Sequence, residues 1–303
     1  MSKTTNNSTD FKKRGISDLM LLLTAILWGS GFLAQRLGAD NVTSFTFNAF
    51  RYILASLTLL ILAKFRLPTD RESLKIIFWA GLVSYAGSTC QQTGMKYTSI
   101  GNTGFITTIY VPLVPVISYL LFREKVKKQA FLAAFIAMIG LYLLSTAGNG
   151  LEHMSIGDLI VFIGSFFWAM HIIVVSKAEN IPAAQFSAGQ FLVTAMLHLI
   201  SWAVIDGAPT ANLISIAPAI LYSGIIVVGF GFTLQAIGQK NSGSAEAAII
   251  LGLESVFAMI FGTIFYGERF NLIQAIGAIL IFFSIIVSVW SNRQSAVEDL
   301  KIN

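Results

Sequence analysis

The stretch that decides the fold class is Ile276–Val289, IGAILIFFSIIVSV, in which only a glycine and two serines interrupt the apolar side chains. A strand of a membrane barrel would alternate between apolar lipid-facing and polar lumen-facing positions, and this run does not alternate. A helix satisfies all of its backbone hydrogen bonds within one segment, as the interior of a bilayer requires. The stretch therefore predicts a membrane-spanning helix.

The composition of the whole chain agrees with this prediction. Of its 303 residues, 55% are hydrophobic and only 12% are charged, whereas a soluble domain carries about 25% charged residues. Cys90 is the one cysteine, so an intramolecular disulfide and a thiolate metal cluster are both excluded. We expect no metal and no cofactor. Because the basic residues adjoin hydrophobic runs, the expected partner is the lipid bilayer and not nucleic acid.

Ten runs along the chain are apolar enough to span. A spanning helix needs about 20 mainly apolar residues, and the loops between the runs are short, with prolines at 68, 182 and 209. The predicted spans are Ser17–Leu37, Thr43–Phe65, Leu74–Gly94, Asn102–Phe122, Gln129–Ala147, Ile156–Ser176, Gln185–Ile205, Ile214–Ala236, Ala245–Tyr266 and Leu272–Trp290.

The basic residues predict how these spans cross the membrane, because loops rich in Lys and Arg stay in the cytoplasm. With a cytoplasmic N-terminus, sixteen Lys and Arg residues near the span ends lie inside, and only Arg36, Lys96 and Arg269 lie outside. This predicts a multi-pass protein of the cell (plasma or inner) membrane with both termini in the cytoplasm. The basic residues 12–14 before the first span could also start a signal peptide, but this span belongs to the repeat described next, so we expect it to be retained.

The two halves of the chain resemble one another. Ile16-Ser17-Asp18-Leu19 precedes Trp28 as Ile156-Gly157-Asp158-Leu159 precedes Trp168, at an offset of 140 residues. Further matches follow in the same order at offsets of 139 to 144: Arg51 with Gln190, Gly81 with Gly224, Gln92 with Gln235, Gly94 with Gly238, and Glu124 with Glu268. The predicted organisation is a cytoplasmic tail (1–14), a first repeat (15–147), a second repeat (156–291) and a second tail (292–303).

The number of spans in each half determines how the two halves are oriented relative to one another in the membrane. Five is odd, so the second half enters the membrane from the opposite side, and the fold class is all-α with ten transmembrane helices in two inverted repeats. Such symmetry is a known route to alternating access, with the substrate site near the midplane where the halves meet.

Two motifs at corresponding places carry a resemblance to a known family. The first is Gly101-Asn102-Thr103-Gly104-Phe105-Ile106-Thr107 with Tyr110, Pro112, Pro115 and Arg123-Glu124. The second is Ser244-Ala245-Glu246-Ala247-Ala248, then Leu253-Glu254-Ser255-Val256-Phe257-Ala258 and Tyr266-Gly267-Glu268-Arg269. Over residues 17–291 the chain resembles EamA-type transporters of the drug/metabolite transporter superfamily. The resemblance implies a ten-helix exporter of small metabolites, often amino acids. The family usually has proline where this chain has Ser255, so the family pattern gives no argument for a kink there.

Charged residues within the spans are the leading site candidates, because a charge at the centre of a spanning helix costs about 2.5–3.5 kcal/mol on insertion scales. Glu254 could bind a substrate ammonium or carry a coupling proton, or it could be a structural hydrogen-bonding group. Tyr110 is its counterpart at an offset of 144. Arg51 could neutralise a substrate carboxylate, snorkel to the headgroups or pair with a buried acid.

Uncharged candidates complete the predicted binding set. They are Trp28 and Trp168 as cavity walls or packing residues, Tyr85, Gln92 and Gln235 as hydrogen-bonding groups, and His171 as a proton relay or an interhelical contact. His198 is expected to be an interhelical contact. Gln91 also supplies hydrogen bonds. Asp18 and Asp158 fit helix N-termini, whereas Glu124 and Glu268 fit ion pairs or caps of the following helix.

Enzymatic activity is not expected, because the chain has no nucleophile-base-orienter set and no G-x-x-x-x-G-K-[ST] phosphate loop. The predicted function is secondary export of small metabolites, such as amino acids, through a cavity lined by the first, third, fourth, sixth, eighth and ninth spans. The fifth and tenth spans would lie at the periphery. A multidrug exporter is the alternative within this class. A lipid flippase or a non-transporting membrane subunit is the alternative outside it. The substrate, the coupling ion (a proton is one candidate), the direction, and the choice between monomer and homodimer stay open.

Overall fold

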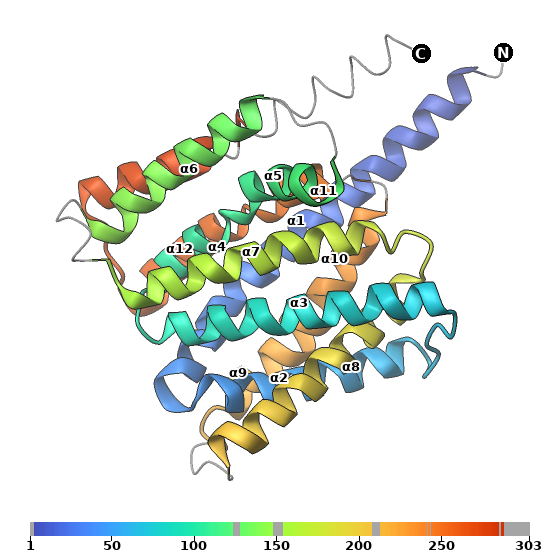
Figure 1. Ribbon diagram of the computed structural model, residues 1–303, viewed down its shortest axis with the longest axis horizontal. Helices are drawn as coiled ribbons and strands as arrows, with labels where there is room; N and C mark the ends of the chain where they lie inside the picture. The colour runs from blue at the N-terminus through green and yellow to red at the C-terminus, as the bar shows by residue number, and fades with distance from the viewer. Residues whose placement is uncertain are drawn as a thin grey trace.

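The computed structural model describes residues 3–123, 128–147, 154–207, 213–240, 242, 244–284 and 286–287, and these form helices joined by turns and loops, without a strand. Figure 1 shows these helices side by side in one bundle, with α1 and α7 running in opposite directions. The first half contains α1 (Lys3–Asn41), α2 (Ser44–Leu62), α3 (Arg71–Met95), α4 (Ile100–Thr107), α5 (Tyr110–Phe122) and α6 (Lys128–Thr146). The second half contains α7 (Ile156–Ser176), α8 (Ala183–Ser201), η2 (Trp202–Asp206), α9 (Ala217–Leu221), η3 (Tyr222–Phe230), α10 (Gly231–Gln239), α11 (Ser244–Leu251) and α12 (Glu254–Tyr266), where η marks the wider π-helical turns.

Seven helical segments of the described chain are long and apolar enough to cross a membrane: Gly15–Asn41, Ser44–Leu62, Ile100–Leu121, Ile156–Ser176, Ala183–Asp206, Ala217–Gln239 and Ala247–Tyr266. The predicted third span is α3, which is long enough but carries polar side chains that turn inward, among them Ser84, Ser88 and Gln92. The predicted fifth and tenth spans contain the shorter apolar helices Phe131–Thr146 and Leu272–Ser284. These two pack together at one edge of the bundle, where Gly140 lies against Gly277. The count of ten spans stays a prediction.

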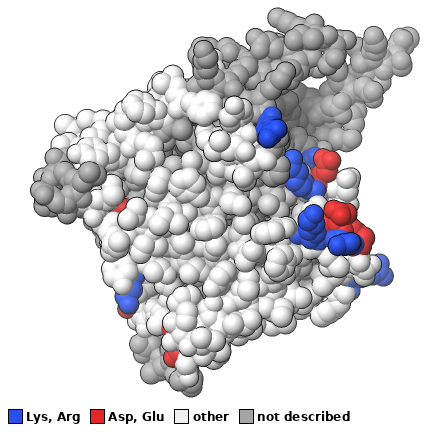
Figure 2. Space-filling model, viewed as in Figure 1, with Lys and Arg blue, Asp and Glu red and all other residues white. Residues whose placement is uncertain are grey.

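Charged side chains gather at the two ends of the helices. Figure 2 shows them at opposite edges of one face, separated by a broad uncharged surface. Large apolar side chains on the outer surface of the helices are exposed, for example Leu120, Phe135 and Ile264, as expected for surface that faces lipid. We call the end with the α1–α2 and α3–α4 loops the Arg36 end, and the opposite end, with the α2–α3 loop, the Lys64 end.

Short polar side chains begin several of the helices. Thr43 precedes α2, Ser99 precedes α4 and Ser155 precedes α7, and each side chain accepts a hydrogen bond from a backbone N–H of the first turn. Such caps satisfy donors that have no partner inside the helix. Asp70 does the same before α3, and the hydrogen bond from the Ser73 N–H lowers the pKa of its carboxyl group.

The predicted fourth span is broken into α4 and α5. Thr108 and Ile109 form the turn between them. Pro112 has no N–H to donate to the carbonyl of Thr108, and this carbonyl accepts instead from Val111, at 2.9 Å. The break therefore lies one turn before Pro112.

The predicted ninth span is also broken, which the sequence did not indicate. Gly252 and Leu253 separate α11 from α12 without any proline. Ser255 takes part instead, because its hydroxyl donates to the carbonyl of Gly252 at 2.8 Å and its N–H donates to the same oxygen at 3.2 Å. A serine thus satisfies the carbonyl that the turn frees, and Glu254 becomes the first residue of α12.

The first helix, α1, begins earlier in the chain than predicted. Asp18 was predicted to lie at a helix N-terminus, but α1 begins at Lys3, so Asp18 lies inside the helix. No proline precedes it, and the helix continues into the segment that was predicted to be a tail. Asp158 does lie in the first turn of α7, as predicted.

The helices α3 and α7 are in close contact at Gly94. A Cβ atom at Gly94 would lie 2.7 Å from the backbone oxygen of Gly157 and 2.6 Å from the Val161 side chain. To relieve these contacts the backbone of one helix would have to move, which costs free energy of folding. We expect Gly94→Ala to destabilise the protein by about 1–3 kcal/mol, measured as a lower thermal unfolding midpoint in detergent. Gly15→Ala is the matched control, since nothing lies within 4 Å of that position. Equal midpoints for both variants would contradict this packing.

Candidate functional site

A cavity lies in the middle of the bundle, between the two halves of the chain. Its empty space, counting the space at its mouth, is about 510 Å³. Its walls come from α1, α2, α3, α4, α5, α7, η3, α10 and α12, so the second span contributes in addition to those predicted. The lining residues are Trp28, Phe32, Gln35, Arg51, Tyr52, Gln91, Thr107, Tyr110, Trp168, His171, Ile172, Val227, Val228, Phe232 and Glu254.

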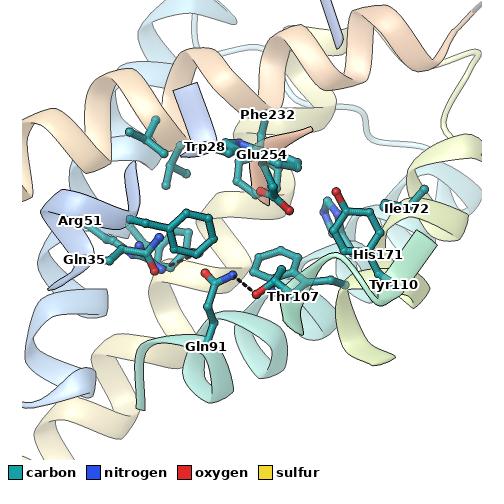
Figure 3. A pocket seen from close by; sticks show the side chains of 15 residues that line it. Trp28, Gln35, Arg51, Gln91, Thr107, Tyr110, His171, Ile172, Phe232 and Glu254 are labelled. Carbon is teal, nitrogen blue, oxygen red and sulfur yellow. Dashed lines mark hydrogen bonds between the residues drawn. The ribbon is translucent and has the colours of Figure 1, made fainter. Parts of the chain in front are cut away.

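Figure 3 shows how the polar groups divide within the cavity. Arg51 and Gln35 lie on one side, and Glu254, Tyr110 and His171 lie towards the other. Six of the nine predicted binding residues line the cavity: Trp28, Arg51, Tyr110, Trp168, His171 and Glu254.

The other three predicted residues lie outside the cavity. The Tyr85 hydroxyl is 2.6 Å from the Ser201 hydroxyl. Gln92 donates through Nε2 to the backbone oxygen of Gln35, at 2.8 Å. Gln235 is fully buried in α10 and its side chain has no hydrogen-bond partner among the described residues. Tyr85 and Gln92 therefore serve contacts between helices in this structure.

Arg51 is held by aromatic rings. Its guanidinium lies 4.7 Å from the centre of the Tyr52 ring and 5.4 Å from that of Phe47. Nη2 donates to the Tyr52 hydroxyl at 3.3 Å, while Nε has no hydrogen-bond partner. Within the described part of the chain no carboxylate lies close enough to form an ion pair with Arg51. Because the residue is 2% exposed, a buried positive charge is available to an anionic group in the cavity.

Glu254 and Tyr110 lie at equivalent breaks. Each is the first residue after the turn that interrupts its span, Tyr110 in α5 and Glu254 in α12. Both are buried and near enough to influence each other electrostatically, but the Tyr110 hydroxyl and Glu254 Oε1 have no hydrogen-bond partner among the described residues. Among the described residues no basic side chain forms an ion pair with Glu254. The glutamate is therefore an acidic group in the cavity without a cationic partner.

The two intramembrane histidines differ in position. His171 donates through Nε2 to Gln190 Oε1 at 2.9 Å, and its Nδ1 has no partner among the described residues. It thus makes an interhelical contact and also lines the cavity. His198 lies outside the cavity, 3.0 Å from the Ser88 hydroxyl and stacked on Tyr52 at 5.1 Å, which agrees with the interhelical contact predicted for it.

Aromatic side chains form one wall of the cavity. The rings of Trp28 and Phe232 lie 4.5 Å apart, and those of Trp168 and Phe232 lie 6.0 Å apart. The two tryptophans, predicted as symmetry partners, therefore meet the same phenylalanine. Both indole nitrogens lack a hydrogen-bond partner among the described residues.

The binding set predicted from the sequence omitted several lining residues. Gln91, which donates to the Thr107 hydroxyl at 3.1 Å, and Gln35 carried a signal, because both are amides within apolar spans. Thr107 ends the first family motif. Phe232 carried no signal, since it is one of 24 phenylalanines. Glu268 does act as a helix cap, but for α4 in the other half and not for the following helix. Glu124 lies outside the described residues.

Comparisons with known proteins agree with a transporter. The model of the EamA-like transporter family matches the chain twice, over residues 15–146 and 155–290. An uncharacterized transporter of Archaeoglobus fulgidus is 30% identical over 278 residues, covering 91% of this chain and 86% of that protein. The uncharacterized transporter YyaM of Bacillus subtilis is 23% identical over 282 residues, covering 89% and 92%. A crystal structure of a protein that is 18% identical has the same fold, with a TM-score of 0.68 over 92% of this chain and 98% of that one.

These matches span both halves of the chain and cover the residues that line the cavity. With seven apolar helices of sufficient length, they indicate a multi-pass membrane transporter rather than an enzyme. The chain belongs to the EamA-like transporter family.

Proposed function

We propose that this protein is a secondary transporter that exports a small metabolite with both an acidic and a basic group, such as an amino acid. The observation that carries the proposal is that one cavity is lined by both a basic residue, Arg51, and an acidic residue, Glu254. Both are buried, and neither has an ion-pair partner among the described residues. Export, as opposed to uptake, is proposed from the family resemblance.

The charges explain the choice of a zwitterion. Burying an unpaired ionised group is costly, and a substrate with a carboxylate and an ammonium group would relieve both costs at once. The carboxylate would bind the guanidinium of Arg51, which forms forked hydrogen bonds with such groups. The ammonium would bind Glu254, with Tyr110 beside it. Gln35 and Gln91 add neutral hydrogen-bonding groups near Arg51.

We propose alternating access because the two halves of the chain are predicted to be related as an inverted repeat of ten spans, and contacts between the helices support this relation. Gly94 in α3 lies against Val161 in α7, and Gly238 in α10 lies against Leu21 in α1. The glycines are 144 residues apart and the apolar partners are 140 apart, as in the sequence repeat. Two further pairs of contacts are related by the repeat in the same way. Gly81 lies against Val193 as Gly224 lies against Leu54, and Gly87 lies against Trp168 as Gly231 lies against Trp28. Matched contacts of this kind support a two-fold relation between the halves.

The broken helices support a site at the midplane. Transporters built from inverted repeats often bind substrate where helices are discontinuous, because the breaks bring polar backbone ends to the cavity. Here α4–α5 and α11–α12 break at equivalent positions, and the first residue after each break lines the cavity. The excess of basic residues at the Lys64 end supports a cytoplasmic location for that end and for both termini.

Efflux from proteoliposomes tests the proposal. Vesicles with and without the protein are loaded with a mixture of amino acids, sugars, nucleosides and cationic dyes, and the compounds released are measured by mass spectrometry, with and without a proton gradient. We expect protein-dependent release of amino acids or related zwitterions. Release of sugars or nucleosides alone would contradict the substrate class. No release, together with movement of fluorescent lipids between leaflets, would favour a flippase.

A multidrug exporter is the second candidate, favoured by the aromatic wall of Trp28, Trp168 and Phe232. Flat aromatic cations stack on such rings and pair with a buried glutamate. In the same assay this function would appear as release of the cationic dyes without release of amino acids.

A further inference from the structure

A carboxylate joins the two halves of the chain at the Arg36 end. Glu268 follows the end of α12, and its carboxylate accepts hydrogen bonds from the first backbone N–H groups of α4. Oε1 is 2.6 Å from the nitrogen of Ile100, and Oε2 is 2.9 Å from that of Gly101. The first N–H groups of a helix have no partner inside it, and a carboxylate also interacts favourably with the positive end of the helix dipole. Glu268 therefore ties α4 of the first half to α12 of the second.

An apolar plug lies beneath this link. Phe32, Met95, Ile100 and Ala258 are buried against one another, and they come from α1, α3, α4 and α12. Phe32 also lines the cavity, so the plug begins at the cavity and extends towards the Arg36 end. A packed apolar layer of this kind opposes the passage of water and polar solutes between the cavity and the Arg36 end, because it offers them no hydrogen bonds.

The loop between α3 and α4 is fixed to two further helices. Arg36 in α1 donates through Nη1 to the backbone oxygens of Met95 and Thr98, at 2.9 and 2.8 Å. The Thr98 hydroxyl donates to Asp158 in α7 at 2.5 Å. Helices from both halves thus hold the loop that leads into α4.

The contact between α4 and α12 leaves no room for an added methyl group at Gly104. A Cβ atom at Gly104 of α4 would lie 2.6 Å from the Cβ of Ala258 in α12, and one at Gly262 of α12 would lie 3.4 Å from the Cβ of Ile100 in α4. The two helices therefore meet at close range, and a single added methyl group would push them apart.

From these contacts we infer that Glu268 is the latch of a gate at the Arg36 end. When its carboxylate binds the start of α4, the α4–α12 contact and the apolar plug close the cavity on that side. When the two hydrogen bonds break, α4 and α12 separate and the cavity opens there. This inference rests on the proposed alternating access, but it does not depend on which substrate is carried.

Accessibility of a single thiol tests the latch without any substrate. Cys90→Ser removes the native thiol, and Val228→Cys places one in the cavity wall, where Val228 is buried. A membrane-impermeant, charged thiol reagent is applied to intact cells and, separately, to inside-out vesicles. Lys96→Cys in the same Cys90→Ser background identifies the exposed face at the Arg36 end. From that face we expect Glu268→Gln to raise the rate of reaction at position 228 by roughly tenfold, because two charge-assisted hydrogen bonds are weakened.

Two comparisons make the result decisive. Arg269→Gln removes the neighbouring exposed charge and should leave the rate unchanged. Gly104→Ala should raise the rate as Glu268→Gln does, and adding Ala258→Gly, which removes the colliding methyl group, should restore it. Each protein must elute as a monodisperse peak before labelling. An unchanged rate in both single variants, or an equal rise in Arg269→Gln, would overturn the latch. A thiol that no reagent reaches from either face in any variant would instead contradict alternating access, and with it the proposed function.

Discussion

Replacement of Glu254 by glutamine is expected to reduce efflux of a zwitterionic substrate by roughly 10- to 100-fold, since hydrogen bonds to charged groups contribute about 1.5–3 kcal/mol. Glutamine has nearly the same size and keeps one carbonyl oxygen, so the packing of α12 should survive. It lacks the negative charge that would pair with the substrate ammonium. Initial rates from proteoliposomes, with the amino acid that the efflux panel identifies, measure the effect.

The same variant tests proton coupling. Glutamine does not bind a proton in the physiological pH range, so any efflux that remains in Glu254→Gln should no longer respond to a pH gradient. Glu179→Gln is the matched control, because Glu179 is an exposed acidic residue near the end of α7 and its loss should change neither rate nor pH response. Wild-type efflux and pH dependence in Glu254→Gln would mean that the carboxylate neither binds substrate nor carries a proton.

The positions of most helices could be predicted from the sequence, because a long apolar run inside a bilayer has to form a helix to satisfy its backbone hydrogen bonds. The predicted sixth span, Ile156–Ser176, coincides with α7. The break before Glu254 was not readable. It depends on a turn at Gly252 that the Ser255 hydroxyl completes, and serine is common elsewhere in the spans, where it does not interrupt a helix.

The candidate site was readable in part, because charged and bulky polar side chains inside apolar spans stand out. Arg51, Tyr110 and Glu254 were identified in this way. What a single sequence does not give is the rotation of each helix. Gln91 and Gln92 are neighbours, and one residue turns an α-helix by about 100°. Gln91 consequently lines the cavity, whereas Gln92 points to α1 and binds the backbone of Gln35.

Replacement of Arg51 by glutamine, the residue at the matching position of the second half, is expected to remove discrimination between substrates with and without a carboxylate. Efflux of the amino acid should fall by roughly 10- to 100-fold, whereas efflux of the amine formed from it by decarboxylation should change little. Arg51→Lys should be intermediate, because lysine keeps the charge but loses the planar fork and the stacking on Phe47 and Tyr52. Initial rates for the two compounds, measured side by side in proteoliposomes, give the ratio.

A structural role for Arg51 would give a different pattern. Its guanidinium packs on two buried rings, and loss of this packing could lower the amount of folded transporter, which would reduce efflux of both compounds by the same factor. The ratio of the two rates separates these cases, because it does not depend on how much protein is active. Arg66→Gln, at an exposed position near the Lys64 end, controls for loss of one positive charge and should leave the ratio unchanged. An unchanged ratio in Arg51→Gln would exclude recognition of a carboxylate by Arg51, and the acidic end of the proposed substrate with it.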